Sequence, residues 1–120
     1  MLGLRTTIYR VPDLQKAKEW YAKVFKVAPY FENEFYVGFN IKGYELGLEK
    51  SDSIQEKSDN VLSYWGVNNI DETYSFLLNS NATEHSKPIN VGGEIVVASV
   101  KDPWNNVLGI IFNPEFKLNT

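Results

Sequence analysis

Two glutamates form the residue pair whose types and spacing best suit chemistry in this chain. Glu45 and Glu49 fall on one face of an expected strand over Tyr44–Glu49, because side chains alternate between the two faces of a strand. Paired carboxylates catalyse proton transfer where burial separates their pKa values. We interpret Glu49 as part of a solvated face, whereas for Glu45 a catalytic and a solvated role both stay open. Arg10 is a candidate partner for Glu45 or for an anionic ligand, and Tyr64 adds a ring and a hydroxyl.

Residue counts exclude several other chemistries. The 120 residues contain no cysteine, which rules out disulfides and thiolate chemistry. The one histidine, His85, follows no ligand spacing, and we interpret it as a solvated loop residue in no Ser/His/Asp arrangement. Gly92-Gly93 lacks a phosphate-loop pattern and is interpreted as a turn. A net charge of −3, without Lys/Arg runs or long apolar segments, argues against nucleic-acid and membrane partners and favours a cytoplasmic protein.

The first half of the chain predicts a strand, a helix and three more strands. Leu4–Val11 is β-prone, and Asp13 suits the N-cap of a helix that starts at Leu14. Apolar residues then recur at helical spacing. The strands expected after this helix are Tyr30–Phe31, Phe35–Ile41 and Tyr44–Glu49, the last two joined by a hairpin turn at Lys42-Gly43.

The second half repeats this order after a polar linker over residues 51–60. A strand over Val61–Val67 precedes a helix from Ile70, which Asn69 and Glu72 cap. The segments expected next are a weak strand or loop over Thr83–Val91 broken by Pro88, and strands Ile95–Val100 and Val107–Phe112 around a turn at Asp102–Asn106. A shift of 56 residues aligns the two halves, so the chain is a tandem of two βαβββ modules.

Four phrases carry a family resemblance: R-V-P-D-L from Arg10, E-W-Y from Glu19, G-Y-E-L-G-L-E from Gly43 and K-D-P-W-N-N-V-L-G-I-I from Lys101. Together they resemble the vicinal-oxygen-chelate superfamily, which contains glyoxalases, bleomycin-resistance proteins and extradiol dioxygenases. The resemblance implies an α+β fold in which two paired βαβββ modules form a curved mixed sheet with helices outside. One domain over 1–120 would then comprise module one (1–50), the linker (51–60) and module two (61–116).

The resemblance also implies where metal ligands would lie. Metal-using members hold a divalent ion with four residues, usually two His and two Glu. The His positions fall on Thr6 and Leu62, and the Glu positions fall on Gly109 and on either Glu45 or Gly47. At most one ligand survives, and a leucine or a glycine side chain offers no donor atom. We therefore expect no metal and no cofactor.

Strand alternation assigns residues to a core face and an opposite face. Under the helices we expect Tyr9, Val11, Tyr44, Leu46 and Leu48, with their second-half counterparts. In the family the opposite face is the concave wall of a binding cavity, where Gly47 and Gly109 would leave free volume. The substrate-binding residues expected there are Thr6, Ile8, Arg10, Glu45, Tyr64, Trp104, Gly109 and Ile111, with Trp104 at the rim or in a dimer contact.

Three functions fit this pattern. The first is a metal-free, homodimeric protein that binds a small organic molecule in the cavity, as the bleomycin-resistance proteins imply. The second is an enzyme, either a glyoxalase-like lyase or a metal-free catalyst that uses Glu45 and Tyr64. The third is a non-catalytic scaffold or regulatory module. The sequence leaves open the ligand, the existence of a reaction, and whether two chains share the cavity.

Overall fold

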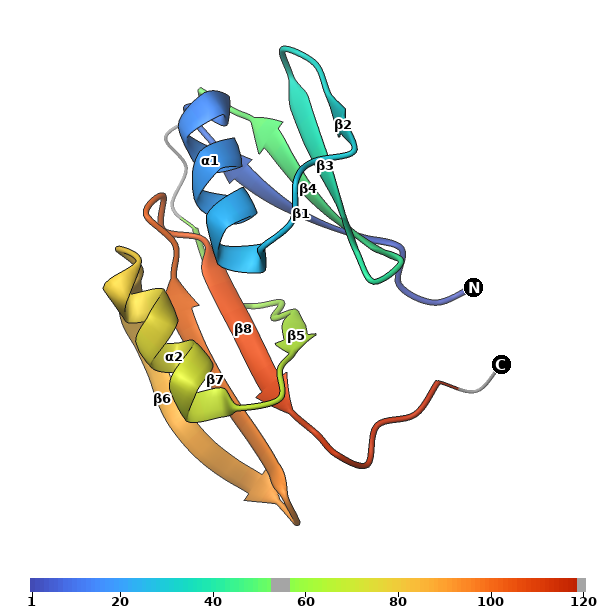
Figure 1. Cartoon of the computed structure of the whole chain (residues 1–120), viewed down its shortest axis with the longest axis vertical. Helices are drawn as coiled ribbons and strands as arrows, with labels where there is room; N and C mark the ends of the chain where they lie inside the picture. Colours follow the sequence, from blue (N-terminus) through green and yellow to red (C-terminus); the bar gives the residue numbers. More distant parts are fainter. Residues whose placement is uncertain (53–56, 119–120) are drawn as a thin grey trace. The chain divides into compact units, whose positions relative to one another are not determined.

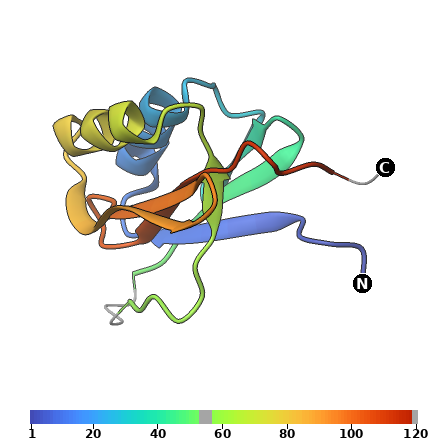
Figure 2. The same ribbon diagram turned by 90° about the horizontal axis from the view of Figure 1, so that it is seen from below.

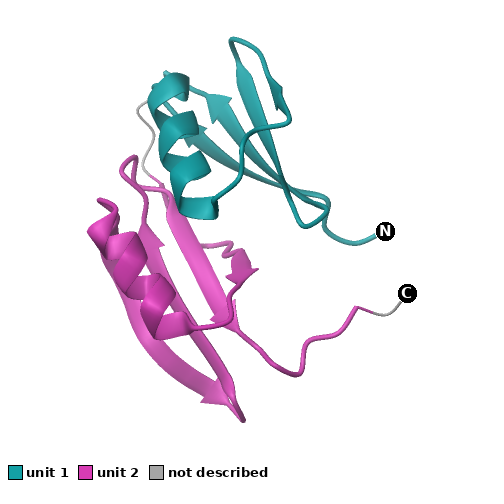
Figure 3. Ribbon diagram, in the orientation of Figure 1, with its two compact units in different colours: residues 1–56 teal, residues 57–120 magenta. Residues whose placement is uncertain are grey.

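Each half of the chain folds into a four-stranded sheet with one helix across it (Figure 1). The computed structural model describes residues 1–52 and 57–118. Two compact units divide the chain, residues 1–56 and residues 57–120 (Figure 3). Their boundary falls inside the predicted linker, of which residues 53–56 lie outside the described part. The combination of both units in one domain stays a prediction.

The first unit contains β1 (Thr6–Val11), α1 (Leu14–Phe25), β2 (Phe31–Glu32), β3 (Tyr36–Ile41) and β4 (Tyr44–Lys50). Its sheet has the order β1-β4-β3-β2, in which β1 is parallel to β4 and the other pairs are antiparallel. Helix α1 packs against β3 and β4. The predicted βαβββ order is confirmed for this half.

Local signals account for where α1 starts and ends. The Asp13 side chain accepts a hydrogen bond from the Lys16 backbone N–H at 3.1 Å, which caps the first turn. Lys26 ends the helix in the left-handed region with φ 57°. The buried face of α1 carries Trp20 and Tyr21, and the Tyr21 ring stacks on Tyr9 of β1 with centroids 5.5 Å apart. The apolar spacing in the sequence therefore forms the helix–sheet core of this unit.

The second unit contains β5 (Tyr64–Gly66), α2 (Ile70–Asn79), β6 (Thr83–Gly92), β7 (Ile95–Lys101) and β8 (Val107–Phe112). Its sheet has the order β5-β8-β7-β6, with β5 parallel to β8. Helix α2 packs on β6, β7 and β8, and the Asn69 side chain caps it by accepting the Glu72 N–H at 3.0 Å. Figure 2 shows each helix lying across one face of its own unit's sheet.

Two strand predictions in the second unit need correction. Only Tyr64–Gly66 pairs with β8, so β5 is shorter than the predicted Val61–Val67, and Val61 and Leu62 are exposed. Thr83–Gly92 is a full strand, not a weak one. It tolerates Pro88 because β6 is an edge strand, where a missing N–H disrupts no second ladder, and its register with β7 shifts between Ser86 and Ile89.

The predicted hairpin turn at Lys42-Gly43 and the core face of β4 are confirmed, except at Tyr44. Lys42 and Gly43 both have positive φ, 54° and 95°, as a two-residue hairpin turn requires. Leu46 and Leu48 are fully buried under α1. Tyr44, predicted as core, is 40% exposed because it begins β4 directly after the hairpin turn, beyond the helix. No helix of the described part is long and apolar enough to cross a membrane.

Candidate functional site

The open face of the first unit's sheet carries the polar residues predicted for a site. Parallel pairing of β1 with β4 places Thr6 beside Glu45, Ile8 beside Gly47 and Arg10 beside Glu49. Thr6, Ile8 and Arg10 are exposed, whereas Tyr9 and Val11 between and after them are buried under α1. The alternation predicted for β1 is therefore confirmed, and Thr6, Ile8 and Glu45 are neighbours on one surface.

Two tyrosines hold the Glu45 carboxylate. The Tyr30 hydroxyl donates a hydrogen bond to Oε1, and the Tyr36 hydroxyl donates one to Oε2 at 2.5 Å. Tyr36 lies on β3, next to β4, and Tyr30 directly precedes β2, at the far edge of the same sheet. Each carboxylate oxygen thus has a neutral donor, an arrangement that sequence reasoning missed.

The rings of these tyrosines pack directly over two glycines of the sheet, Gly38 and Gly47, which we call the glycine floor. Gly38 and Gly47 pair across β3 and β4. A Cβ at Gly47 would lie 2.2 Å from the Tyr36 hydroxyl oxygen, and a Cβ at Gly38 would lie 3.1 Å from the Tyr30 ring. The expectation of free volume at Gly47 is therefore wrong, because the Tyr36 ring fills it.

Both phenols are held in the protonated form. Burial and the hydrogen bond to Glu45 raise the pKa of Tyr36 far above its ordinary value. The hydrogen bond to Glu45 and some desolvation also raise the pKa of Tyr30. At neutral pH the two hydroxyls act as donors to the carboxylate and not as bases.

Arg10 does not reach Glu45. Its Nε lies 3.0 Å from Oε1 of Glu49, in an ion pair whose side chains are 65% and 41% exposed. The register explains the choice, because Arg10 lies directly opposite Glu49 and four positions beyond the Thr6–Glu45 pair. Of the two roles considered for Arg10, pairing with Glu45 is not observed, and contact with an anionic ligand stays a prediction. An exposed ion pair such as Arg10–Glu49 contributes about 0–1 kcal/mol.

Tyr64 plays the covering role in the second unit. It pairs with Gly109 across β5 and β8 and is 41% exposed. A Cβ at Gly109 would lie 2.6 Å from the Ser63 backbone oxygen and 2.8 Å from the Tyr64 ring. Gly109 is buried, so the free volume expected there is also filled. Ile111, two residues along β8, is half-buried.

The residues at the family's metal-ligand positions do not fit a divalent ion. Leu62 and Gly109 have no donor atom, and Thr6 offers only a neutral hydroxyl. The remaining carboxylate, Glu45, already accepts a phenol hydrogen bond on each oxygen. In residues 1–52 and 57–118 no three His, Cys, Asp or Glu residues cluster as metal ligands would.

His85 is not a solvated loop residue as predicted. It lies on β6, where its Nδ1 is 2.7 Å from the Ser99 hydroxyl and its Nε2 is 3.2 Å from Asp59 Oδ2. Sequence reasoning missed this Ser/His/Asp arrangement because it treated 83–91 as a weak strand and 51–60 as a linker. Ser99 is only 3% exposed in the middle of β7, so a substrate carbonyl cannot approach its oxygen. The arrangement satisfies a buried hydroxyl and fixes the start of the second unit to its sheet.

The turn between β7 and β8 is organised by Asp102. This carboxylate is buried and accepts the backbone N–H groups of Trp104 and Asn106 at 2.9 and 2.8 Å. The Lys57 ammonium donates to the Trp104 carbonyl at 2.9 Å, and burial lowers the pKa of Lys57 despite the nearby Asp102 charge. Trp104 is half-buried, and its position at a cavity rim stays a prediction.

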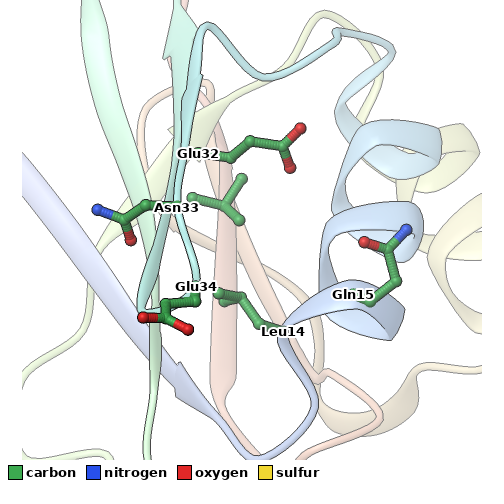
Figure 4. A pocket seen from close by; sticks show the side chains of 6 residues that line it. Leu14, Gln15, Glu32, Asn33 and Glu34 are labelled. Atoms are coloured by element: carbon green, nitrogen blue, oxygen red, sulfur yellow. The ribbon is translucent and has the colours of Figure 1, made fainter.

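A pocket of about 190 Å³ lies elsewhere on the first unit (Figure 4). It is formed where the start of α1 faces the segment from β2 to β3, and its lining residues are Leu14, Gln15, Glu32, Asn33, Glu34 and Val37. Its volume is below the roughly 300–1,000 Å³ of ligand pockets in general, and it shares no residue with the predicted site.

Comparisons with known proteins support the fold. No protein-family model matches the sequence, and no curated protein matches it either. A glyoxalase-related enzyme from Fulvimarina pelagi is structurally similar with a TM-score of 0.78 at 15% identity, over 99% of this chain and 94% of that one. The fosfomycin resistance protein FosX from Listeria monocytogenes gives 0.78 at 19% identity, over 96% of both chains. A glyoxalase/bleomycin resistance protein/dioxygenase family enzyme from Burkholderia phytofirmans gives 0.76 at 15%, over 89% and 95%. At these identities the likeness establishes the fold that the sequence motifs predict.

Proposed function

We propose, starting from the glyoxalase/bleomycin-resistance fold of this chain, that the protein binds a small organic molecule without the help of a metal. The residues proposed for ligand contact belong to strands of both sheets and to one turn. They are Thr6, Ile8, Arg10 and Glu45 in the first unit, and Tyr64, Gly109 and Ile111 in the second, with Trp104 in the β7–β8 turn. Fold alone does not choose a function, so the proposal rests on these residues.

The observation that carries the proposal is the state of Glu45. It is the only carboxylate at a family ligand position, and both of its oxygens are bound by tyrosine hydroxyls. A metal bound by Glu45 would share the carboxylate with Tyr30 and Tyr36, and the other family ligand positions, Thr6, Leu62 and Gly109, carry no carboxylate or imidazole. Metal-dependent isomerisation and ring cleavage need the ion to stabilise charge on the substrate oxygens, and this donor set does not supply that.

Exposed apolar and aromatic side chains favour binding on these strands. Ile8 is 46% exposed and Tyr30 62% in the unit that carries the polar groups of Thr6 and Glu45, and Tyr64 is 41% exposed in the second unit. Ligand sites combine such apolar surface with a few oriented polar groups. The exposed aromatic rings therefore offer contact area to a ligand, and the Glu45 carboxylate offers a polar group that would orient it.

The experiment has a metal arm and a ligand arm. Elemental analysis of dialysed protein without a His-tag should give well under one Zn, Ni, Mn or Fe per chain, and a stoichiometric metal would refute the metal-free part. A thermal-shift screen of small aromatic and aliphatic compounds should find a stabilising ligand, since a ligand at ~100 times its Kd adds roughly 2.7 kcal/mol.

Tyr64→Ala tests the location of the ligand. Because the Tyr64 ring is partly exposed, truncation should weaken binding and cost less stability than the roughly 3–5 kcal/mol of a buried aromatic residue. Tyr44→Ala is the matched control, since Tyr44 is exposed to the same degree and lies outside the proposed contact set. Equal effects of both changes on affinity would contradict the assignment of Tyr64.

A further inference from the structure

The Glu45 carboxylate is the uncompensated charge of the first unit's open face. Its hydrogen-bond donors are the neutral hydroxyls of Tyr30 and Tyr36, and within the described residues no Lys or Arg forms an ion pair with it. The arginine on the same face, Arg10, is paired with Glu49. A carboxylate also accepts more than the two bonds it has here, because each oxygen offers about two lone pairs. Glu45 therefore keeps both negative charge and acceptor capacity for a ligand.

Aromatic residues lie next to this charge. The Tyr30 ring is 62% exposed, and Phe31, 47% exposed, lies next to Tyr36 with ring centroids 6.3 Å apart. The face of an aromatic ring attracts a cation placed within about 6 Å of its centroid. The rings and the carboxylate thus favour the same sign of charge.

The glycine floor fixes the direction from which a ligand can come. Gly38 and Gly47 let the two rings lie directly on the sheet, with no space beneath them for a ligand group. The open approach is from the solvent side, next to Ile8, which pairs with Gly47 and is 46% exposed. A ligand that reaches Glu45 from there can place an apolar body on Ile8.

We propose that Glu45, Tyr30 and Tyr36 bind a small organic cation, an amine or quaternary ammonium group attached to a short apolar body. This inference rests on the proposed function and specifies the charge of its ligand. An anion would meet the Glu45 charge with Arg10 already engaged, and a divalent metal would find one carboxylate and two protonated phenols. A cationic nitrogen would meet the Glu45 carboxylate and the neighbouring tyrosine rings.

The test uses choline and its neutral isostere, 3,3-dimethylbutan-1-ol, as probes in NMR titrations of the full chain. We expect choline to shift the resonances of Tyr30, Tyr36 and Glu45 saturably, and to bind about tenfold more tightly than the isostere. Glu45→Gln should reduce choline affinity to that of the isostere. Glu34→Gln, an exposed carboxylate of the same unit outside this site, should leave it unchanged. Equal affinities for the two probes, or an unchanged affinity of Glu45→Gln, would overturn the inference.

A second variant pair separates the ring from the hydroxyl. Tyr30→Phe keeps the aromatic face, and Tyr30→Leu removes it, while Tyr30 is exposed enough for both variants to fold. Choline affinity should fall about threefold or more in Tyr30→Leu relative to Tyr30→Phe. Equal affinities in the two variants would overturn the role of the ring.

Failure of this inference is distinguishable from failure of the proposed function. Phenol and benzoate are titrated in parallel as a neutral and an anionic aromatic probe. If either binds saturably to the open faces and choline does not, the protein binds small molecules but the cation inference is wrong. If no probe binds and the ligand screen finds nothing, both are wrong.

Discussion

Gly109→Ala tests the claim that the family's last ligand position has no room for a side chain. Gly109 is buried on β8, and a Cβ there would lie 2.6 Å from the Ser63 backbone oxygen and 2.8 Å from the Tyr64 ring. Ordinary contacts of this kind are longer by close to one ångström. The ring can turn away, but the carbonyl belongs to the neighbouring chain segment and moves only if the backbone entering β5 moves.

The expected cost follows from this contact. Forcing a methyl group into a packed site costs about 1–3 kcal/mol. Replacing glycine by alanine returns roughly 0.4–1 kcal/mol by restricting the unfolded chain. The midpoints of these ranges give a net loss of about 1.3 kcal/mol, and at roughly 4 °C per kcal/mol this lowers Tm by about 5 °C.

Gly66→Ala is the matched control. Gly66 lies on β5 in the same sheet and also lacks a positive φ, but nothing lies within 4 Å of a Cβ built on it. It should be neutral or more stable by up to roughly 1 kcal/mol. Both variants are compared with the parent by urea unfolding, in which a shifted midpoint at constant m reports a change in stability.

The two outcomes are well separated. If Gly109→Ala is as stable as Gly66→Ala, the close packing of Ser63 and Tyr64 over Gly109 is wrong, and a ligand side chain could be accommodated there. Adding Tyr64→Ala to Gly109→Ala should not restore stability, since the Ser63 oxygen remains. Full rescue would show that the ring and not the backbone is the obstacle.

Three further predictions concern other parts of the structure. Burial and a hydrogen bond to Glu84 raise the pKa of Tyr74 to about 12, so the free energy of unfolding should fall as pH rises from about 10 to 12. Tyr74→Phe should reduce this fall when urea unfolding is measured across that pH range. The same fall in the variant and the parent would contradict the role of Tyr74. His85→Leu should destabilise the protein by about 1–3 kcal/mol, because it leaves the buried Ser99 hydroxyl without its hydrogen-bond partner. In a double-mutant cycle, Ser99→Ala should recover most of that loss, whereas strictly additive losses would disprove the coupling. We also expect a twofold homodimer, so light scattering at micromolar concentration should give about twice the 13.7 kDa chain mass, and a monomer at every dilution would exclude it.

Much of the fold was predictable because its signals are local. Helix starts are marked by Asp13 and Asn69, whose side chains cap the first turn within three residues. The hairpin turn at Lys42 and Gly43 needs only two positive φ angles. Core faces follow from alternation along each strand, so the burial of Leu46 was expected. Each of these features depends on neighbours in sequence.

Part of the candidate site was also determined by residue type alone. The side chains of Leu62 and Gly109 offer no donor atom in any conformation, so residue types alone argued against the ligand set that the resemblance implies. The glycines did not by themselves show whether space is left beside them. A glycine indicates that something comes close to the backbone or that space is left, and the sequence does not say which. At Gly47 and Gly109 the structure decides for close approach, by Tyr36 and Tyr64.

Long-range register decided the rest. Arg10 meets Glu49 and not Glu45 because β1 and β4 pair in one of several registers that the same alternation permits. Tyr30 and Tyr36 reach Glu45 from 15 and 9 residues away, which requires the order of β2, β3 and β4 in the sheet. His85 finds its partner Ser99 only once β6 is placed beside β7. These contacts join residues whose separation in sequence carries no periodic signal, so only the folded sheet brings them together.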